Sequence, residues 1–183
     1  MSALDGFICK EIAGISLPTN VIAYRMDMHR DQKGDMRQIK GIDLGSCSCC
    51  DYFIIRNNSV VLVETTRLQL KVQNTKEECN KMGIVEKEVE KYTIKELRSE
   101  HAMKIYGSML LLCRLSVLCP SIQNALKGKS YAVWIIDESK GNDFMELGDW
   151  LEDQLQGRLK STFGKAVEYV NIILPDMMRQ TLT

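Results

Sequence analysis

The sequence predicts a single α/β domain with three layers, in which helices cover both faces of a central mixed β-sheet. The chain has 183 residues, of which 45% are apolar, and this suits one hydrophobic core. After a short opening helix, stretches with the composition of strands follow one another and then alternate with helical stretches, a pattern typical of α/β proteins. Only three prolines are present, and no repeat or low-complexity segment marks a linker. We therefore expect residues 1–183 to form one domain.

The first part of the chain predicts a short helix followed by antiparallel strands. We expect the helix at residues 3–13 and a strand at 20–27, "NVIAYRMD". The polar "HRDQKGD" predicts a turn, and "MRQIKGIDLG" at 36–45 predicts a returning strand. Two further runs rich in β-branched and aromatic residues lie within 50–66, on either side of "RNNS".

The middle of the chain predicts a helical region and then a buried strand. The helical pattern runs from about residue 75 to 118, with breaks expected near Gly83 and around Tyr92 and a stop before Pro120. "SYAVWIID" at 130–137 is a continuous apolar run, as is typical of a buried parallel strand.

The clearest helix of the sequence follows this strand. Its apolar residues recur at three- and four-residue spacing, at Phe144, Leu147, Leu151, Leu155 and Leu159. Gly164 is placed to end the helix, and "AVEYVNIILP" supplies a last strand. Residues 130–175 therefore predict a β-α-β unit with two parallel strands.

Charge and cysteine content limit the class of protein. Lysine and arginine together number 24, as do aspartate and glutamate, so the chain lacks the basic excess of many nucleic-acid-binding proteins. The start "MSALDGFICKEIAG" argues against a signal peptide, and the most apolar stretch, 105–119, is too short to span a bilayer. Seven cysteines, an odd number, indicate free thiols in a reducing compartment. We expect a cytoplasmic protein with no membrane partner.

The cluster "CSCC" raises the question of a zinc site. It supplies Cys47, Cys49 and Cys50, but a fourth ligand would have to come from a distant cysteine or from one of only two histidines. There is also no second CxxC pair. We therefore do not expect zinc, and we expect these cysteines to fill tight core positions beside a strand.

Two carboxylates flank the predicted hairpin. If the asparagines at 57–58 form a two-residue turn, counting outward along both strands places Asp51 directly opposite Glu64. Opposed side chains share a face with Cβ atoms roughly 4.5–5.5 Å apart, and Thr66 points to the same face. Like charges so close repel unless a cation, a proton or a basic group offsets them. A divalent metal such as Mg²⁺ would do so. The alternative is two carboxylates at exposed strand ends, each bonded to backbone or a nearby base.

Asp51, the turn, "VVLVETT" and the following helix and strand resemble the core of the PD-(D/E)XK nuclease superfamily, the restriction-endonuclease-like fold. In that family a hairpin delivers an Asp from one strand and a (Glu or Asp)-X-Lys from the next, within an α-β-β-β-α-β core. The match covers roughly residues 3–137, with 138–183 as a C-terminal helix and strand extension. The resemblance implies Asp51 and Glu64 as ligands of Mg²⁺ or Mn²⁺, which would activate a water molecule for attack on a phosphodiester.

The sequence departs from this family at the lysine, because Thr66 stands at that position. Threonine carries no positive charge, so catalysis would need a substitute, for which Lys71, Lys91 and Lys95 are candidates. The missing lysine and the neutral net charge favour a nuclease-like protein that binds a protein partner, as a regulatory component of a larger assembly in prokaryotic defence or repair. The alternative, favoured by the carboxylate pair, is an active metal-dependent nuclease acting on DNA or RNA.

Overall fold

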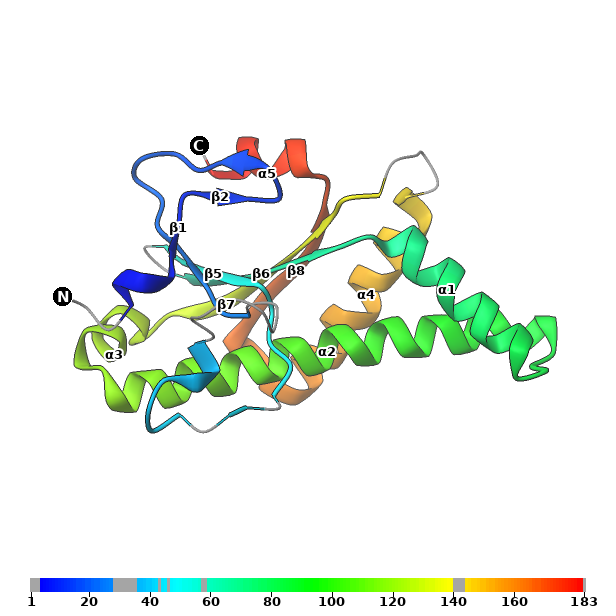
Figure 1. The fold of residues 1–183 in the computed structure, drawn as a ribbon, viewed down its shortest axis with the longest axis horizontal. Helices are drawn as coiled ribbons and strands as arrows, with labels where there is room; N and C mark the ends of the chain where they lie inside the picture. Colours follow the sequence, from blue (N-terminus) through cyan, green and yellow to red (C-terminus); the bar gives the residue numbers. More distant parts are fainter. Residues whose placement is uncertain are drawn as a thin grey trace.

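A six-stranded mixed β-sheet is the centre of the fold, seen in the computed structural model of Figure 1. The structure describes residues 4–27, 36–42, 44–45, 47–56, 59–139 and 144–182. The strands follow the order β1-β4-β5-β6-β7-β8. Their bounds are Ile8–Cys9 (β1), Ala23–Arg25 (β4), Tyr52–Ile55 (β5), Ser59–Thr66 (β6), Ser130–Asp137 (β7) and Val167–Ile173 (β8). A separate hairpin is formed by β2 (Glu11–Ile12) and β3 (Ile15–Ser16).

The sheet has an antiparallel half and a parallel half. β4, β5 and β6 form an antiparallel meander, whereas β6, β7 and β8 run parallel to one another. Helices connect β6 to β7 and β7 to β8, because parallel neighbours need a crossover connection. The predicted mixed sheet and the predicted β-α-β unit are therefore confirmed.

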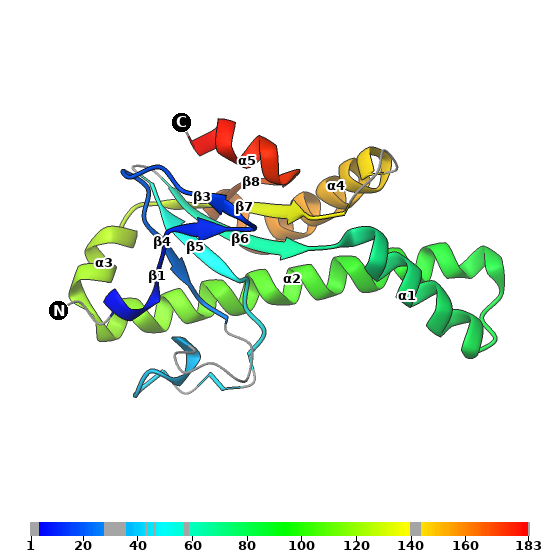
Figure 2. The same ribbon diagram turned by 45° about the horizontal axis from the view of Figure 1, so that its top comes forward.

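Helices lie on both faces of the sheet, but unequally. Their bounds are Leu68–Lys81 (α1), Glu86–Leu118 (α2), Pro120–Leu126 (α3), Phe144–Phe163 (α4) and Pro175–Leu182 (α5), with short 3-10 helices at Asp5–Phe7, Met36–Gln38 and Gly164–Ala166. α1 to α4 pack on one face, while α5 and the β2–β3 hairpin lie over the other (Figure 2). The chain is thus an α/β protein in which a β-hairpin shares the second outer layer with one short helix.

Each face of the sheet has its own apolar core. The helix-side core holds Phe53, Leu62 and Ile135 from the strands together with apolar residues of α2 and α4. Ile54 and Val63, the next residues along, enter the core on the other face. Alternate residues therefore enter opposite cores, so the central strands are buried on both sides and read as continuous apolar runs.

The helix predicted at residues 3–13 is wrong. From Leu4 on, where the description begins, this segment contains a 3-10 turn and then the strands β1 and β2. Ala13 and Gly14, with φ of 51° and 74°, form the two-residue turn that joins β2 to β3. This hairpin places Ile12 in the core beside α5, where it is fully buried.

The strand predicted at 36–45 is also wrong for the residues that the structure describes there, 36–42 and 44–45. They form a 3-10 helix and turns, in which Gly41 has a φ of 94°. Met36 and Ile42 are both buried in the helix-side core, so this compact segment covers the core without joining the sheet. β4 consequently pairs directly with β5. The turn predicted at 29–35 lies outside the described residues.

The helical region begins earlier than the sequence predicted. α1 starts at Leu68, whose backbone N–H donates to Asp137 Oδ1 at 3.0 Å, a cap that β7 supplies from far along the chain. The break near Gly83 is confirmed, since its φ of 70° follows the end of α1. The break expected around Tyr92 is wrong, because α2 is continuous over 33 residues. The helix accommodates the β-branched Thr93, whose hydroxyl donates to a carbonyl of the preceding turn at 2.8 Å.

The helix and strand that follow β7, α4 and β8, follow the prediction closely, whereas α5 after them was not predicted. α4 ends at Phe163, and Gly164 after it has a φ of 58°. Leu151, Leu155 and Leu159 of α4 are all fully buried in the helix-side core. The segment 138–183, in the part that is described, therefore shares its core with the rest of the chain.

Candidate functional site

The β5–β6 hairpin aligns Asp51 with Glu64, as the sequence predicted. Tyr52 pairs with Val63 across the two strands, so Asp51, the residue before β5, comes level with Glu64 on β6. The turn residues 57–58 lie outside the described part of the chain, but the observed register is the one that a two-residue turn requires.

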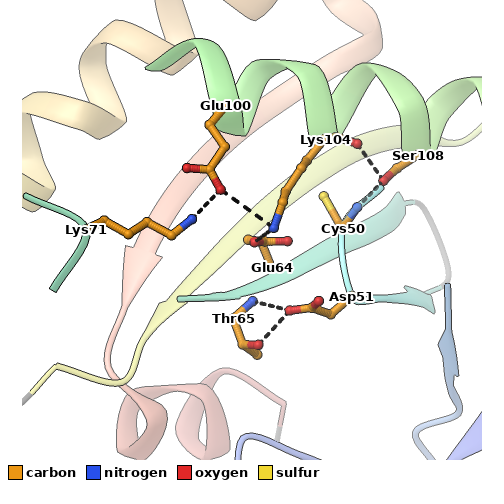
Figure 3. Close-up of polar contacts among 8 residues, drawn as sticks. All are labelled: Cys50, Asp51, Glu64, Thr65, Lys71, Glu100, Lys104 and Ser108. Atoms are coloured by element: carbon orange, nitrogen blue, oxygen red, sulfur yellow. Dashed lines mark hydrogen bonds and ion pairs between the residues drawn. The ribbon is translucent and has the colours of Figure 1, made fainter. Parts of the chain in front are cut away.

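Hydrogen bonds to β6 orient the carboxylate of Asp51. Its Oδ2 accepts from the backbone N–H of Thr65 at 2.7 Å and from the Thr65 hydroxyl at 2.6 Å (Figure 3). The backbone carbonyl of Asp51 accepts from the N–H of Met26 at 2.7 Å, which ties the same residue to the end of β4. Both side-chain bonds use Oδ2, so Oδ1 has no hydrogen-bond partner among the described residues. One carboxylate oxygen is therefore available for a further ligand.

A lysine from α2 reaches Glu64 from above the sheet (Figure 3). The Glu64 side chain is only 2% exposed, and its Oε1 forms an ion pair with Lys104 Nζ. Glu100, one turn earlier on α2, lies 3.9 Å from Lys104 Nζ and pairs with Lys71 of α1. These four side chains form a line of alternating charge that runs from α1 inward to Glu64.

Burial governs the protonation of this line. Removal of Glu64 from water raises its pKa to about 8, and the charge of Asp51 adds to the rise while Lys104 opposes it. Burial by itself would lower the pKa of Lys104, but the charge of Glu64 outweighs this and the pKa is raised. Although burial acts upward on Glu100, its pKa is lowered by Lys71. Lys104 is thus a cation at neutral pH, and a further cation beside Glu64 would favour its ionised form.

One turn of α2 positions both Lys104 and the segment that carries Asp51. The Ser108 hydroxyl accepts the backbone N–H of the residue before Asp51 at 2.7 Å and donates to the Lys104 carbonyl at 2.8 Å. Next to it, Gly107 lies against the Ser48 backbone, since a Cβ at Gly107 would stand 1.9 Å from the Ser48 carbonyl oxygen. The absence of a side chain at this position therefore allows the helix and the Asp51 segment to approach.

Two of the other predicted site residues lie beside this arrangement. Thr66 follows Glu64 on the same face and is 5% exposed, and its hydroxyl has no hydrogen-bond partner within the described part of the chain. Lys71 is connected to the site through its ion pair with Glu100. Neither residue contributes a positive charge in direct contact with Glu64.

The two remaining predicted lysines lie away from the site. Lys91 and Lys95 are exposed on α2, nine or more residues before Lys104, which is about 13 Å or more along the helix axis. Lys104 was not predicted from the sequence, although it interrupts a stripe of α2 positions spaced by three and four residues. That stripe consists of Leu97, His101, Lys104, Ser108, Leu111 and Leu115. A lysine within a core-facing stripe indicates a paired charge.

His101 is a second polar side chain enclosed under α2. It is 1% exposed, and neither ring nitrogen has a hydrogen-bond partner among the described residues. Burial, with the positive charge of Lys71 as the next cause, lowers its pKa to about 3. The imidazole is therefore neutral and adds no charge to the site.

The donors of the site fit Mg²⁺ or Mn²⁺. These ions prefer oxygen ligands, and Mg²⁺ is commonly held by one or two carboxylates while waters complete its shell. Asp51 and Glu64 supply two carboxylates, and Glu64 Oε2 is buried with no partner among the described residues, which a cation would satisfy. No group of three or more His, Cys, Asp or Glu side chains in the described ranges is arranged to hold a metal. Water and substrate oxygens would therefore complete the coordination.

The cysteine cluster lies in the wall of the helix-side core. Cys49 and Cys50 are fully buried, and Cys47 is partly exposed. Burial raises the pKa of Cys49 to about 12, so this thiol stays protonated. The expectation that small thiols fill tight positions beside a strand is confirmed for Cys49 and Cys50. All seven cysteines of the chain are free.

Comparisons with known proteins give neither a family nor a fold assignment. No family model matches the chain, and no curated protein or solved structure shows significant similarity to it. Among the described residues, none of the helices combines the length and the apolar character needed to cross a membrane. Function must therefore be inferred from the arrangement of Asp51, Glu64 and Lys104.

Proposed function

We propose that this protein is a metal-dependent nuclease of the PD-(D/E)XK type, in which Lys104 of α2 replaces the lysine of the family motif. The contact between Lys104 and Glu64 carries the proposal, because it supplies the positive charge that Thr66 cannot. The order of elements adds support, since a meander, helices and a parallel strand succeed one another as in that family's core. The departure is the first core helix, in whose place the described residues form β1, β2 and β3.

Each side chain of the proposed site has a distinct role. A bound Mg²⁺ or Mn²⁺ would lower the pKa of a water molecule and stabilise charge on the phosphate. Asp51 and Glu64 would hold the ion, with Asp51 kept in orientation by Thr65. The ammonium group of Lys104 would donate to the attacking water or to a phosphate oxygen. Thr66 would offer its hydroxyl on the same face.

Lys104 has two acidic neighbours, which allows it to change partner. In the structure its main partner is Glu64, and Glu100 lies 3.9 Å away. Once Glu64 shares its charge with a second cation, its attraction for Lys104 weakens. Glu100 would then keep the ammonium group near the site while leaving it free to donate to the substrate. The exposed fraction of Lys104, 22%, is consistent with access from solvent.

The test combines Mn²⁺ titration calorimetry with cleavage of single- and double-stranded DNA and RNA, at pH 8.5 so that Glu64 is ionised. The proteins are the wild type, Asp51→Asn, Glu64→Gln and Lys104→Met, with Lys95→Met as the matched control for loss of an α2 lysine. We expect the two carboxylate variants to lose Mn²⁺ binding and cleavage together. Lys104→Met should keep Mn²⁺ binding but lose cleavage by about 10²-fold or more, as is usual when a charge-stabilising donor is removed.

One outcome would reject nuclease activity, and another would reject the role of Lys104. The first is absence of cleavage by a wild type that binds Mn²⁺ and is folded. The second is cleavage by Lys104→Met at the wild-type rate, which would remove the lysine from the mechanism. Circular dichroism of every variant separates either result from a loss of folding.

A binding role, which the sequence alone favoured, is the second candidate, and the exposed side of α2 supports it. Met103, Leu110 and Val117 are 60%, 46% and 76% exposed. Their seven-residue spacing places them on one side of the helix, as in the seam of a coiled coil. We propose a second copy of this chain as the occupant, because antiparallel pairing centred on Leu110 would bring Met103 of each copy against Val117 of the other. Such a seam is self-complementary, as a two-fold interface requires.

Analytical ultracentrifugation of the wild type and of Leu110→Glu tests this second candidate. A dimer that Leu110→Glu converts to a monomer would support self-association through α2. A wild type that stays monomeric at 100 times the working concentration of the nuclease assay would exclude it. Leu110 is half exposed, so the substitution leaves the core intact.

A further inference from the structure

A polar pocket opens between α1 and α2 directly beside the candidate site. Its volume is about 300 Å³, and its walls include Lys71, Asn74 and Glu78 from α1 and Tyr92, Glu96 and Glu100 from α2. These residues follow one another at three- and four-residue spacing on each helix, so each set forms one stripe facing the pocket. The volume is at the small end of the range for ligand sites.

The pocket and the site share two side chains. Lys71 and Glu100 line the pocket and also form the outer ion pair of the charged line that ends at Glu64 (Figure 3). From Glu100 inward the exposed fraction of the side chains falls from 42% to 22% at Lys104 and 2% at Glu64, while Lys71 at the outer end is 29% exposed. The pocket therefore lies next to the exposed end of the charged line that leads to Glu64.

The chemistry of the walls selects against a phosphate and for a group that donates hydrogen bonds. Three carboxylates face the pocket and one lysine, Lys71, is already paired with Glu100. Glu78 and Glu96 form no ion pair with any residue that the structure describes. A phosphate would be repelled here, whereas N–H groups of a ligand would be accepted by the carboxylate oxygens.

Tyr92 and Glu96 are one helical turn apart and therefore lie side by side on α2. An aromatic ring beside a carboxylate can bind a planar ligand by stacking while its edge is read by hydrogen bonds, as in the recognition of unpaired bases. Guanine presents two adjacent donors on its Watson–Crick edge, N1–H and the N2 amino group, which match the two oxygens of one carboxylate. Adenine, cytosine and thymine or uracil present at most one donor beside an acceptor, and the acceptor would face carboxylate charge.

We propose that the α1–α2 pocket binds an unpaired guanine next to the scissile phosphate, with Tyr92 stacking on the base and Glu96 reading its edge. This inference rests on the proposed nuclease function, which places a scissile phosphate beside the pocket, but its binding test does not depend on cleavage. The Watson–Crick edge is occupied in a duplex, so the substrate is single-stranded at this position. Lys71 and Glu100 at the mouth would lie between the base and the phosphate.

The test measures fluorescence anisotropy of labelled single-stranded DNA pentamers that differ only in the central base and carry thymine elsewhere. The wild type is used in EDTA, so that no cleavage occurs. We expect the guanine pentamer to bind about tenfold or more tighter than the other three, the discrimination typical of one good bidentate contact. Glu96→Gln should reduce this preference to less than about threefold, and Tyr92→Leu should weaken binding of all four pentamers.

Glu77→Gln is the matched control, because Glu77 belongs to α1 but lines the neighbouring pocket. It should keep the guanine preference.

Equal affinity for all four bases, no binding of any pentamer, or an unchanged preference in Glu96→Gln would each overturn the inference. Guanine-selective binding without cleavage in Mn²⁺ would refute the nuclease proposal alone, and cleavage without any base preference would refute the pocket alone.

Discussion

Replacement of Gly107 by alanine is the sharpest test of how the site is held together. Gly107 lies within α2, and a Cβ added there would stand 1.9 Å from the Ser48 carbonyl oxygen and 2.7 Å from Cys47 Sγ. Gly157 of α4 provides the matched control, because nothing lies within 4 Å of a Cβ added to it. Both positions are inside helices, so the intrinsic helix propensity of alanine acts equally at the two sites.

The structure predicts opposite signs for the two substitutions. In a helix interior alanine is favoured over glycine by about 0.5–1 kcal/mol, so Gly157→Ala should stabilise the protein by that amount. At Gly107 the Ser48 backbone must retreat by about 1 Å before the contact becomes tolerable, and overpacking of this kind costs about 1–3 kcal/mol. The same propensity gain offsets part of this cost, which leaves a net loss of up to about 2.5 kcal/mol. Since about 1 kcal/mol moves the Tm of a domain of this size by 2–4 °C, Gly107→Ala should lower the Tm and Gly157→Ala should raise it.

Differential scanning calorimetry of the three proteins measures these shifts, and Mn²⁺ titration measures the effect on the site. The Ser48 segment leads directly to Asp51, so its displacement should also weaken Mn²⁺ binding in Gly107→Ala. Gly157→Ala should bind Mn²⁺ as the wild type does. If Gly107→Ala stabilises the protein as much as Gly157→Ala does, the close approach of α2 to the Ser48 segment is not part of the native packing.

Three further outcomes follow from the polar groups near the site. Ser108→Ala leaves a buried backbone N–H without its hydrogen-bond partner and should destabilise the protein by about 1–3 kcal/mol. Ser116→Ala is the control, because the Ser116 hydroxyl bonds only within α2, and it should change the free energy of unfolding by less than about 0.5 kcal/mol. Urea denaturation measures both. His101 has a pKa of about 3 in the folded protein, below its usual 6.5, so the wild type should lose stability as pH falls below 6.5. His101→Leu should be at least as stable at pH 7, and its free energy of unfolding should fall less steeply with decreasing pH. An identical pH dependence of stability in the two proteins would contradict this. Because the pKa of Glu64 is about 8, Mn²⁺ affinity should rise up to about tenfold per pH unit between pH 6 and 8 and then level off, and a flat profile would show that Glu64 is not a ligand.

Features that depend on neighbours in the sequence could be predicted. The alternation of β5 and β6 and a two-residue turn were enough to place Asp51 opposite Glu64, because register in a hairpin is set locally. The buried parallel strand at 130–137 and the helix ending before Gly164 were also evident from composition and spacing.

Features that depend on distant contacts could not be predicted in the same way. The start of α1 is fixed by Asp137, which is 69 residues from Leu68 in the chain. The segment 36–45 has the composition of a strand, yet Met36 and Ile42 are buried in the helix-side core and the residues described there stay outside the sheet. Both errors arise because tertiary packing overrides local propensity.

Placing the lysine on a helix makes the candidate site dependent on tertiary packing. In a Glu-X-Lys motif, alternation along one strand is sufficient to put both side chains on the same face. Here 40 residues separate Glu64 from Lys104, and their approach depends on the contacts of Gly107 and Ser108 with the Asp51 segment. Any change that lifts α2 would remove the lysine from Glu64. Stability and activity should therefore fall together in variants at this turn of α2, and should vary independently in variants of α4.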